Sequence, residues 1–337
     1  MTDNKRFLLR RRPDGEPVET DFELVSAAIP APPAGGFVLR NHFASLDPAQ
    51  RGWMDDAPSY MPPIALDDPV RATTVGQVHA SDHPDYAPGD WVMGLNAIEE
   101  YSAVVPDGFT AKVDVSAVDS PSRFLSAFGA VGLTAYFGLL EVAKPQPGET
   151  VLVSGAAGAV GSVVGQIAKI HGCRTVGIAG GPDKCARLVE RYGYDAAVDY
   201  RGKSTEQLAD AIREVTPDGA NIVFENVGGT VFDAELMNLA KHARIVLCGL
   251  ISEYNSETKH GARNLWQVLA QEATLHGYLI SAYVDCFAEG GAQMAKWIAS
   301  GEVVMDEDIQ HGIDNAYPAF MRLFSGANTG KLILALD

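Results

Sequence analysis

The segment 153-VSGAAGAVGS-162 decides the fold, because nearly all of its side chains are too small to pack a core. It follows the apolar run 148-GETVLVSG-155 and leads into 162-SVVGQIAKIHG-172, whose apolar residues recur at helical spacing. Ala156, Gly158 and Gly161 have the spacing of the dinucleotide fingerprint G-x-G-x-x-G, with alanine in the first place. We therefore expect a strand, a tight turn and a helix whose N-terminus receives a pyrophosphate. A side chain at Gly158 would block that approach, and Gly161 and Gly165 are expected to let the helix lie close to the sheet.

The same rhythm of strand, turn and helix continues along the chain after about residue 125. The predicted strands are 150–155, 174–180, 196–200, 221–228, 243–250 and 273–280. Helical stretches lie between most of them, and two of these, 162–172 and 183–193, end in glycine. Alternating strands and helices with continuously apolar strands predict an α/β fold, a doubly wound parallel sheet of the Rossmann type.

The part of the chain before about residue 125 has a different pattern. Short apolar runs at 35–46, 74–82, 89–95 and 101–109 are separated by proline and glycine. These runs are typical of strands joined by turns, so we expect a small, irregular, mostly β domain.

Composition narrows the class of protein further. A chain of 337 residues exceeds one ordinary core, which favours two domains. The net charge of −17 disfavours nucleic-acid and anionic-membrane partners, and no apolar run is long enough to span a bilayer. The apolar stretch near the N-terminus is too short for a secretory signal. The four cysteines show no C-x-x-C spacing, so we expect neither a zinc ribbon nor a disulfide framework, and a reduced, cytoplasmic protein.

The end of the second predicted strand indicates which dinucleotide binds. An NAD site of this kind has a carboxylate about 20 residues after the fingerprint, where it contacts the ribose hydroxyls. Here Gly180 stands at that position and Lys184 follows within one helical turn, which favours the 2′-phosphate of NADP. In the alternative interpretation, Pro182 and Asp183 only open a helix and Lys184 is a solvated surface lysine.

Several motifs together resemble one known family. They are 153-VSGAAGAVGSVVGQIAKIHGC-173, 175-TVGIAGGPDKC-185, 224-FENVGG-229, 248-CGLISEYN-255 and 328-NTGKLILAL-336. These residues, with 59-SYMPPI-64, are similar to the zinc-independent medium-chain dehydrogenase/reductases. The nearest branch is the alkenal/one oxidoreductases, which include leukotriene B4 dehydrogenase/prostaglandin reductases and bacterial curcumin reductases. In 47-DPAQRGWM-54, Ala49 replaces an aromatic residue that is more usual in the prostaglandin reductases, a departure that concerns substrate identity more than reaction type.

The resemblance implies an interrupted domain order and an activity. A GroES-like β domain over residues 1–124 would be completed by residues 318–337, and a Rossmann NADP-binding domain would occupy residues 125–317. The protein would be a homodimer that uses NADPH to reduce the carbon–carbon double bond of an enone or enal. Hydride would reach the β-carbon without the help of a metal.

The resemblance also implies a set of cofactor-binding residues. The pyrophosphate would lie against Gly158, Ala159, Val160, Gly161 and Ser162. Lys184 and Tyr200 would flank the 2′-phosphate. Asn226 would contact the cofactor after the fourth strand. The nicotinamide half would be lined by Thr134, Cys248, Gly249, Tyr254, Tyr278, Leu279, Ile280 and Asn328. Asn226 and Asn328 adjoin Gly or Thr-Gly, so each is also compatible with a plain turn residue.

Two tyrosines are candidates for catalysis. Without a metal, a hydrogen-bond donor must stabilise the developing enolate, and a phenol is a neutral donor at pH 7. Tyr254 is the candidate for orienting the substrate oxygen or delivering the proton, and Tyr60 is a second, substrate-lining hydroxyl. The alternative for each is a half-buried aromatic ring with its hydroxyl in solvent.

The sequence bears on three alternative chemistries. A catalytic zinc is not expected, because the chain has no cysteine before Cys173 to supply a soft ligand. A quinone reductase would use the same fold and coenzyme, and would be distinguished by its rates with naphthoquinones. A non-catalytic NADP-binding protein would bind the coenzyme without oxidising it with any acceptor.

Overall fold

The computed structural model describes residues 3–256 and 258–336, which form two compact units. One unit contains residues 130–306 and 329–331, and the other contains residues up to 129 together with 307–328 and 332 onward. The divisions after Gly129 and Asp306 differ from the predicted boundaries at 124 and 317. The assignment of a separate function to each unit stays a prediction.

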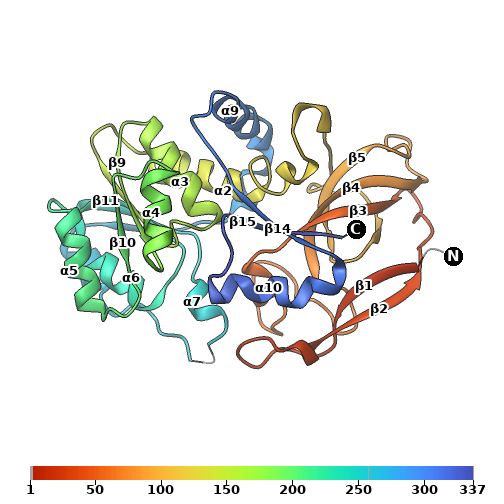
Figure 1. The fold of residues 1–337 in the computed structure, drawn as a ribbon, viewed down its shortest axis with the longest axis horizontal. Helices are drawn as coiled ribbons and strands as arrows, with labels where there is room; N and C mark the ends of the chain where they lie inside the picture. The colour runs from red at the N-terminus through yellow and green to blue at the C-terminus, as the bar shows by residue number, and fades with distance from the viewer. Residues whose placement is uncertain (1–2, 257, 337) are drawn as a thin grey trace. The chain divides into compact units, whose positions relative to one another are not determined.

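The unit of residues 130–306 is built on a parallel sheet, as predicted. Within the described residues its strand order is β10-β9-β8-β11-β12-β13, and Figure 1 labels β9, β10 and β11 of this sheet. The strands are β8 (Thr150–Val153), β9 (Arg174–Ala179), β10 (Ala196–Asp199), β11 (Ala220–Glu225), β12 (Leu239–Leu247) and β13 (Thr274–Gly277). The order reverses direction between β8 and β11, which is the doubly wound arrangement that places ligands at the carboxyl ends of the strands. The Rossmann-type prediction is confirmed.

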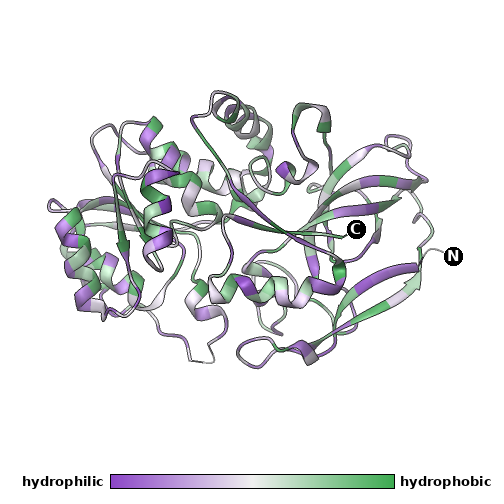
Figure 2. Cartoon of the chain, viewed as in Figure 1, coloured by the Kyte–Doolittle hydropathy of each residue, from purple (hydrophilic) through white to green (hydrophobic). Residues whose placement is uncertain are grey.

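Helices connect these strands and cover the sheet. They are α2 (Ala130–Phe137), the π-helical η4 (Gly138–Ala143), α3 (Ala159–Ile170), α4 (Pro182–Glu190), α5 (Thr205–Val215), α6 (Gly229–Leu236), α7 (Ile251–Tyr254), α8 (Trp266–Ala270), the 3-10 helix η5 (Ile280–Cys286) and α9 (Phe287–Ala299). Helix α5 carries both hydrophilic and hydrophobic residues in Figure 2, and its buried residues are Leu208, Ala209 and Ile212. Gly172 and Gly193, which end the two predicted helical stretches, have φ of 75° and 71°, the left-handed conformation of a helix stop.

The other unit is mostly β, also as predicted. Across the described part of the chain, its larger sheet has the order β14-β15-β3-β4-β5-β7, and β6 pairs with β3. The strands are β3 (Phe37–Ser45), β4 (Arg71–Ser81), β5 (Trp91–Ala97), β6 (Tyr101–Val104), β7 (Ala111–Lys112), β14 (Glu307–His311) and β15 (Lys331–Ala335). Ile333, Leu334 and Ala335 pair antiparallel with β3, so the end of the chain completes this sheet.

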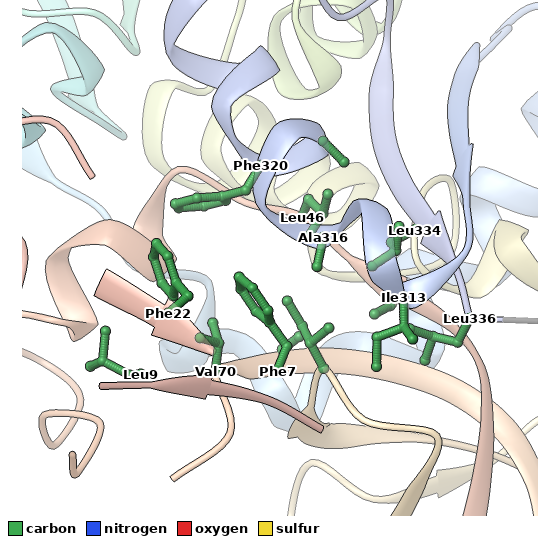
Figure 3. Close-up of a cluster of buried hydrophobic side chains, with 14 of the residues drawn as sticks. Phe7, Leu9, Phe22, Leu46, Val70, Ile313, Ala316, Phe320, Leu334 and Leu336 are labelled. Atoms are coloured by element: carbon green, nitrogen blue, oxygen red, sulfur yellow. The ribbon is translucent and has the colours of Figure 1, made fainter. Parts of the chain in front are cut away.

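A hairpin that the sequence did not predict precedes this sheet. Strand β1 (Asp3–Leu9) pairs antiparallel with β2 (Phe22–Ala28), and the chain between them includes the 3-10 helix η1 (Glu19–Asp21). The apolar residues of the hairpin do not alternate regularly with polar ones, but Phe7, Leu9 and Phe22 lie in the core of this unit with Phe320 and Leu334 (Figure 3). Tertiary packing therefore supports strands whose local pattern is weak.

Short helices complete the β unit. They are α1 (Ala49–Trp53), η2 (Val115–Ala117), η3 (Pro121–Phe124), η6 (Ile313–Asn315) and α10 (Ala316–Ser325). Helix α10 contributes Ala316, Ala319 and Phe320 to the core seen in Figure 3. Among the residues described, the structure contains no helix of the length and apolar character that crossing a membrane requires.

Candidate functional site

The predicted site residues of the Rossmann unit follow the carboxyl ends of its parallel strands. Ser154–Gly158 follow β8, and Gly180 and Gly181 follow β9. Tyr200 follows β10, Asn226 follows β11, and Cys248 follows β12. Because these ends share one edge of a parallel sheet, residues far apart in sequence come to the same side of the unit.

The turn after β8 explains why its residues are small. Gly155 has φ of 57°, a left-handed conformation that favours glycine. A Cβ built on Gly161 would lie 2.6 Å from the Gly155 carbonyl oxygen and 2.7 Å from Ala156 Cα. The alanine at the first fingerprint position is accommodated by the neighbouring strand, because a Cβ on Gly177 would lie 2.9 Å from the Ala156 Cβ. Gly161 therefore brings α3 close to the turn, as expected.

Gly165 has a different role from the one predicted. A Cβ at this position would lie 2.1 Å from Cζ of Tyr194, and not against a strand. The Tyr194 ring is buried and its hydroxyl donates to the Gly161 carbonyl at 2.6 Å. Gly165 thus makes room for an aromatic ring that fastens the first turn of α3.

The start of α3 offers backbone donors at its outer end. Gly158 is the N-cap and has no side chain to cap the helix, and Ala159 and Val160 are partly exposed. The first N–H groups of a helix have no intrahelical acceptor, so they can receive a phosphate oxygen. Ser162 differs from them, because its N–H donates to Gly158 at 3.0 Å and its hydroxyl to Ala159 at 3.2 Å. It is also buried, so its part in binding a pyrophosphate stays a prediction.

Basic and aromatic side chains cover the corner after β9. A Cβ built on Gly180 would lie 3.0 Å from Arg201 Nε and 3.0 Å from the Tyr200 hydroxyl. The Gly181 N–H donates to Asp199 Oδ1 at 2.8 Å, and the Arg201 N–H donates to the same oxygen at 2.9 Å. Gly180 therefore has two effects. It replaces the carboxylate of an NAD site, and its lack of a side chain leaves the space that Arg201 and Tyr200 occupy.

Lys184 lies beside this corner on α4. Partial burial lowers the pKa of Lys184, and the positive charge of Arg201 lowers it further. An anion between the two cations would relieve their repulsion. Asp183 is exposed in the first turn of the same helix. Arg201 was missed in the sequence, although its place directly after Tyr200 at the end of a predicted strand was an available signal.

Asn226 connects the ends of β8 and β11. Its side-chain amide donates to the Ser154 carbonyl at 2.8 Å, and its backbone N–H donates to Ser154 Oγ at 2.9 Å. Its own carbonyl accepts the Ile251 N–H at 3.2 Å, at the start of α7. Asn226 thus has a clear structural role, and a contact between it and a cofactor stays a prediction.

The turn after β12 holds Tyr254 by its hydroxyl. The Leu250 N–H donates to the Tyr254 hydroxyl at 3.3 Å, and the Cys248 N–H donates to the Glu225 carbonyl at 2.9 Å. Burial raises the pKa of the Cys248 thiol to about 12, and the nearby Glu225 raises it too. Cys248 is therefore a neutral thiol on a partly exposed residue, whereas a nucleophilic cysteine needs a lowered pKa.

The remaining predicted residues of this unit differ in exposure. Tyr278 is 6% exposed and Leu279 is 44% exposed. The Tyr278 ring lies against η4, where a Cβ on Gly138 would be 3.0 Å from it, and burial raises the pKa of its hydroxyl. Thr134 is partly exposed on α2, and Ile280 is partly exposed at the start of η5.

Tyr60 and Asn328 belong to the β unit. The Tyr60 side chain is 52% exposed, and its ring centroid lies 6.4 Å from that of Trp53 in an edge-to-face arrangement. Asn328 immediately precedes Thr329–Lys331, the short segment that belongs to the Rossmann unit. In that segment, Gly330 forms a β-bridge with Gly158 at the start of α3.

The residues of this edge fit a phosphorylated dinucleotide. A glycine N-cap opens α3, and a cationic corner with no acid at Gly180 adjoins it. Among the described residues, no three His, Cys, Asp or Glu side chains are grouped closely enough to hold a metal ion.

Comparison with known proteins places the chain in a family. Residues 5–112 match a family described as the N-terminal domain of oxidoreductase, and residues 159–299 match one described as zinc-binding dehydrogenase. The chain is 38% identical to the NADPH-dependent curcumin reductase of Escherichia coli (strain K12), over 98% of this chain and 96% of that one. It is 37% identical to the 2-alkenal reductase (NADP(+)-dependent) of Nicotiana tabacum, over 99% and 98% of the two chains.

A solved structure agrees with these relatives. CurA from Vibrio vulnificus, in complex with NADPH, matches with a TM-score of 0.93 and 36% identity over 99% of each chain. The predicted resemblance is thereby confirmed over nearly the whole length. The chain belongs to the zinc-independent branch of the medium-chain dehydrogenase/reductases, the branch of the curcumin and alkenal reductases.

Proposed function

We propose that this protein is an NADPH-dependent reductase of the carbon–carbon double bond in α,β-unsaturated ketones and aldehydes. The observation that carries the proposal is the corner at Gly180, where Lys184, Tyr200 and Arg201 gather beside the phosphate-binding turn. The names of the relatives support the reaction class, since they include a curcumin reductase, a 2-alkenal reductase and a (+)-pulegone reductase.

Different residues of the Rossmann unit bind different parts of the coenzyme. The first N–H groups of α3 hold the pyrophosphate, and Lys184, Tyr200 and Arg201 hold the 2′-phosphate. Asn226, Cys248 and Tyr254 border the nicotinamide half, with Thr134 and the residues 278–280. When bound, NADPH supplies the hydride that adds to the β-carbon of the substrate.

Tyr254 is the proposed proton donor or orienting hydroxyl. The Leu250 N–H, which donates to its oxygen at 3.3 Å, holds the phenol in place at the end of the short helix α7. A neutral phenol can stabilise the enolate and deliver a proton to the carbon next to the carbonyl group. Tyr60 is proposed as a substrate-lining residue of the β unit.

We also propose that the protein is a homodimer, as the family resemblance implies. Strand β13 is at one end of the parallel sheet, and all four of its residues are exposed. Leu265, Trp266 and Leu269 are 48%, 71% and 65% exposed. An edge strand bordered by large apolar side chains favours burial against a second copy. Light scattering should give the mass of a dimer for the wild type and a smaller mass for Trp266→Asp.

The test of the proposed function is NADPH consumption with a panel of acceptors. We expect oxidation with trans-2-alkenals, alkenones and curcumin, and much slower oxidation when NADH replaces NADPH. Faster turnover of naphthoquinones than of every enone would indicate a quinone reductase instead. Binding of NADPH without oxidation by any acceptor would indicate a non-catalytic nucleotide-binding protein.

A further inference from the structure

Glu225, the last residue of β11, forms hydrogen bonds with the three turns after β8, β11 and β12. These turns belong to the part of the proposed cofactor site that would receive the nicotinamide half. Its carboxylate accepts the Val227 N–H at 2.8 Å, and it also accepts the Gly228 N–H and the Ser154 hydroxyl. Its carbonyl accepts the Cys248 N–H at 2.9 Å. The turns after β8, β11 and β12 are therefore held by one fully buried residue.

A second acid lies beside it on α6. Glu235 is 0% exposed, and no N–H or O–H group of the described residues donates a hydrogen bond to either of its carboxyl oxygens. Burial raises its pKa well above the ordinary value, and the like charge of Glu225 raises it further.

Only one of these two acids can be ionised at low energetic cost. Two adjacent carboxylates in a buried site repel each other, so one of them keeps a proton. Glu225 already accepts hydrogen bonds from three donors. Glu235 has none, so the proton belongs on Glu235, where the carboxylic acid can donate to Glu225.

We propose that Glu235 is a protonated positioning residue, which donates a hydrogen bond to Glu225 and thereby fixes the turns that receive the nicotinamide half of the coenzyme. This inference rests on the proposed function for its ligand. Glu235 does not touch the coenzyme in this account. It acts through Glu225, whose oxygens order the N–H groups of Val227 and Gly228.

Two substitutions of Glu235 separate this role from simple packing. Glu235→Gln keeps the shape and a donor, so it should bind NADPH within about twofold of the wild type. Glu235→Leu keeps the bulk but removes the donor, so NADPH should bind about tenfold more weakly. The leucine should not lower the melting temperature, because apolar residues in place of buried charged groups are often neutral or stabilising. Weaker binding without lost stability is a result that a merely structural role would not give.

A readout without coenzyme tests the same claim. In the unliganded protein, the amides of Val227, Gly228 and Cys248 should exchange with solvent about tenfold faster in Glu235→Leu than in the wild type. They should exchange at the wild-type rate in Glu235→Gln. If Glu235→Leu does not fold, Ser154→Ala removes another donor to Glu225 and should speed exchange of the same amides.

Asp233→Asn is the matched control on the same helix. Asp233 is also buried, but it accepts the Arg263 N–H at 2.7 Å and so holds a different loop. It should lower the melting temperature and leave NADPH affinity unchanged.

The proposal is overturned if Glu235→Leu binds NADPH and exchanges its amides like the wild type. Equal losses of affinity in Glu235→Gln and Glu235→Leu, or in Asp233→Asn, would also overturn it. A wild type that binds no NADPH would defeat the proposed function instead, while the exchange rates would still decide whether Glu235 holds the turns.

Discussion

The two ends of the proposed cofactor site use opposite electrostatics. At the outer end, after β9 and β10, Lys184 and Arg201 are partly or fully open to water, Tyr200 is 40% exposed, and the carboxylate of Asp199 accepts backbone N–H groups. At the inner end, after β11 and β12, the groups are acidic and closed, and Glu225 and Glu235 are both 0% exposed. The outer end is suited to selecting a ligand by charge, whereas the inner end is suited to holding a backbone shape.

The difference follows from what each environment does to a charge. Lys184 and Arg201 can keep their charges near water and exchange solvent for a phosphate. A charge at the inner end has no such solvent, so it must be hydrogen-bonded, as Glu225 is, or neutralised, as we propose for Glu235. Substitutions at the outer end should therefore change the preference for NADPH over NADH. Substitutions at the inner end should change the binding or turnover of both coenzymes alike.

The largest effect is expected at the outer end. Lys184→Ala and Arg201→Ala should each raise the KM for NADPH about 10- to 100-fold, because a hydrogen bond to a charged group is worth about 1.5–3 kcal/mol. The KM for NADH should change little, since NADH has no 2′-phosphate. Steady-state kinetics with both coenzymes would measure the split.

Lys169→Ala provides the control for these two variants. Lys169 is also on the Rossmann unit, but it pairs with Asp195 at 2.7 Å near the far end of α3. Its removal should leave both KM values unchanged. Equal increases in KM for NADPH and NADH in Lys184→Ala would show that Lys184 does not recognise the 2′-phosphate.

Helix α3, which follows the turn after β8, should respond to added side-chain bulk instead of to charge. Gly165→Ala places a Cβ where the Tyr194 ring lies, at 2.1 Å, and so should destabilise the protein by about 1–3 kcal/mol. Gly291→Ala in α9 meets no atom within 4 Å, and it should stabilise the protein by about 0.4–1 kcal/mol. Urea unfolding of both variants would test the contrast. Equal stabilities would show that the Tyr194 ring moves aside without cost.

A smaller effect is expected for the hydroxyl at the inner end. Tyr254→Phe should lower kcat by about tenfold or more, because it removes a proposed acid catalyst, while the Kd for NADPH should stay nearly the same. Rapid-mixing kinetics and a binding titration would separate the two quantities. Unchanged kcat would exclude Tyr254 from proton delivery.

The smallest effect concerns a charge cluster outside the site, which Asp306 forms with Arg187 and Arg191 at the end of α4. Asp306 accepts the Tyr192 hydroxyl at 2.8 Å and Arg191 at 3.0 Å. Although burial opposes ionisation, these partners and Arg187 lower the pKa of Asp306 to about 2. Because the folded-state pKa is lowered, the stabilisation is present above the unfolded value and is lost as pH falls toward 2.

Asp306→Asn should therefore lower the free energy of unfolding by about 1 kcal/mol at pH 7, since the arginines are partly solvated. The difference from the wild type should shrink between pH 4 and pH 2 in urea titrations. A difference that stays constant over this range would mean that the charge of Asp306 contributes nothing.

The sequence was most informative where a residue type is required by one kind of structure, as small residues are in a tight turn and apolar runs are in a buried strand. The small residues from Val153 to Ser162 predicted the turn, and the apolar runs predicted all the strands of the parallel sheet. The family resemblance covered both units. Periodicity could not predict β1 and β2, because their apolar residues do not alternate regularly with polar ones and their packing depends on tertiary contacts with α10 and β15.

The parts of the site that the sequence missed depend on contacts between distant residues. Arg201 and Gly180 are about 20 positions apart, and only the pairing of β9 with β10 brings them together. Glu235 looked like an ordinary helical residue, because nothing in its neighbourhood reveals that its side chain is buried beside Glu225. Such pairs follow from the packing of the sheet and cannot be found from local patterns.

The most direct test of the account is a calorimetric comparison of NADPH and NADH binding to the wild-type protein. The cationic corner at Gly180 predicts that NADPH binds at least about tenfold more tightly, and that the preference weakens as salt screens the exposed charges. Equal dissociation constants for the two coenzymes at low salt would contradict it.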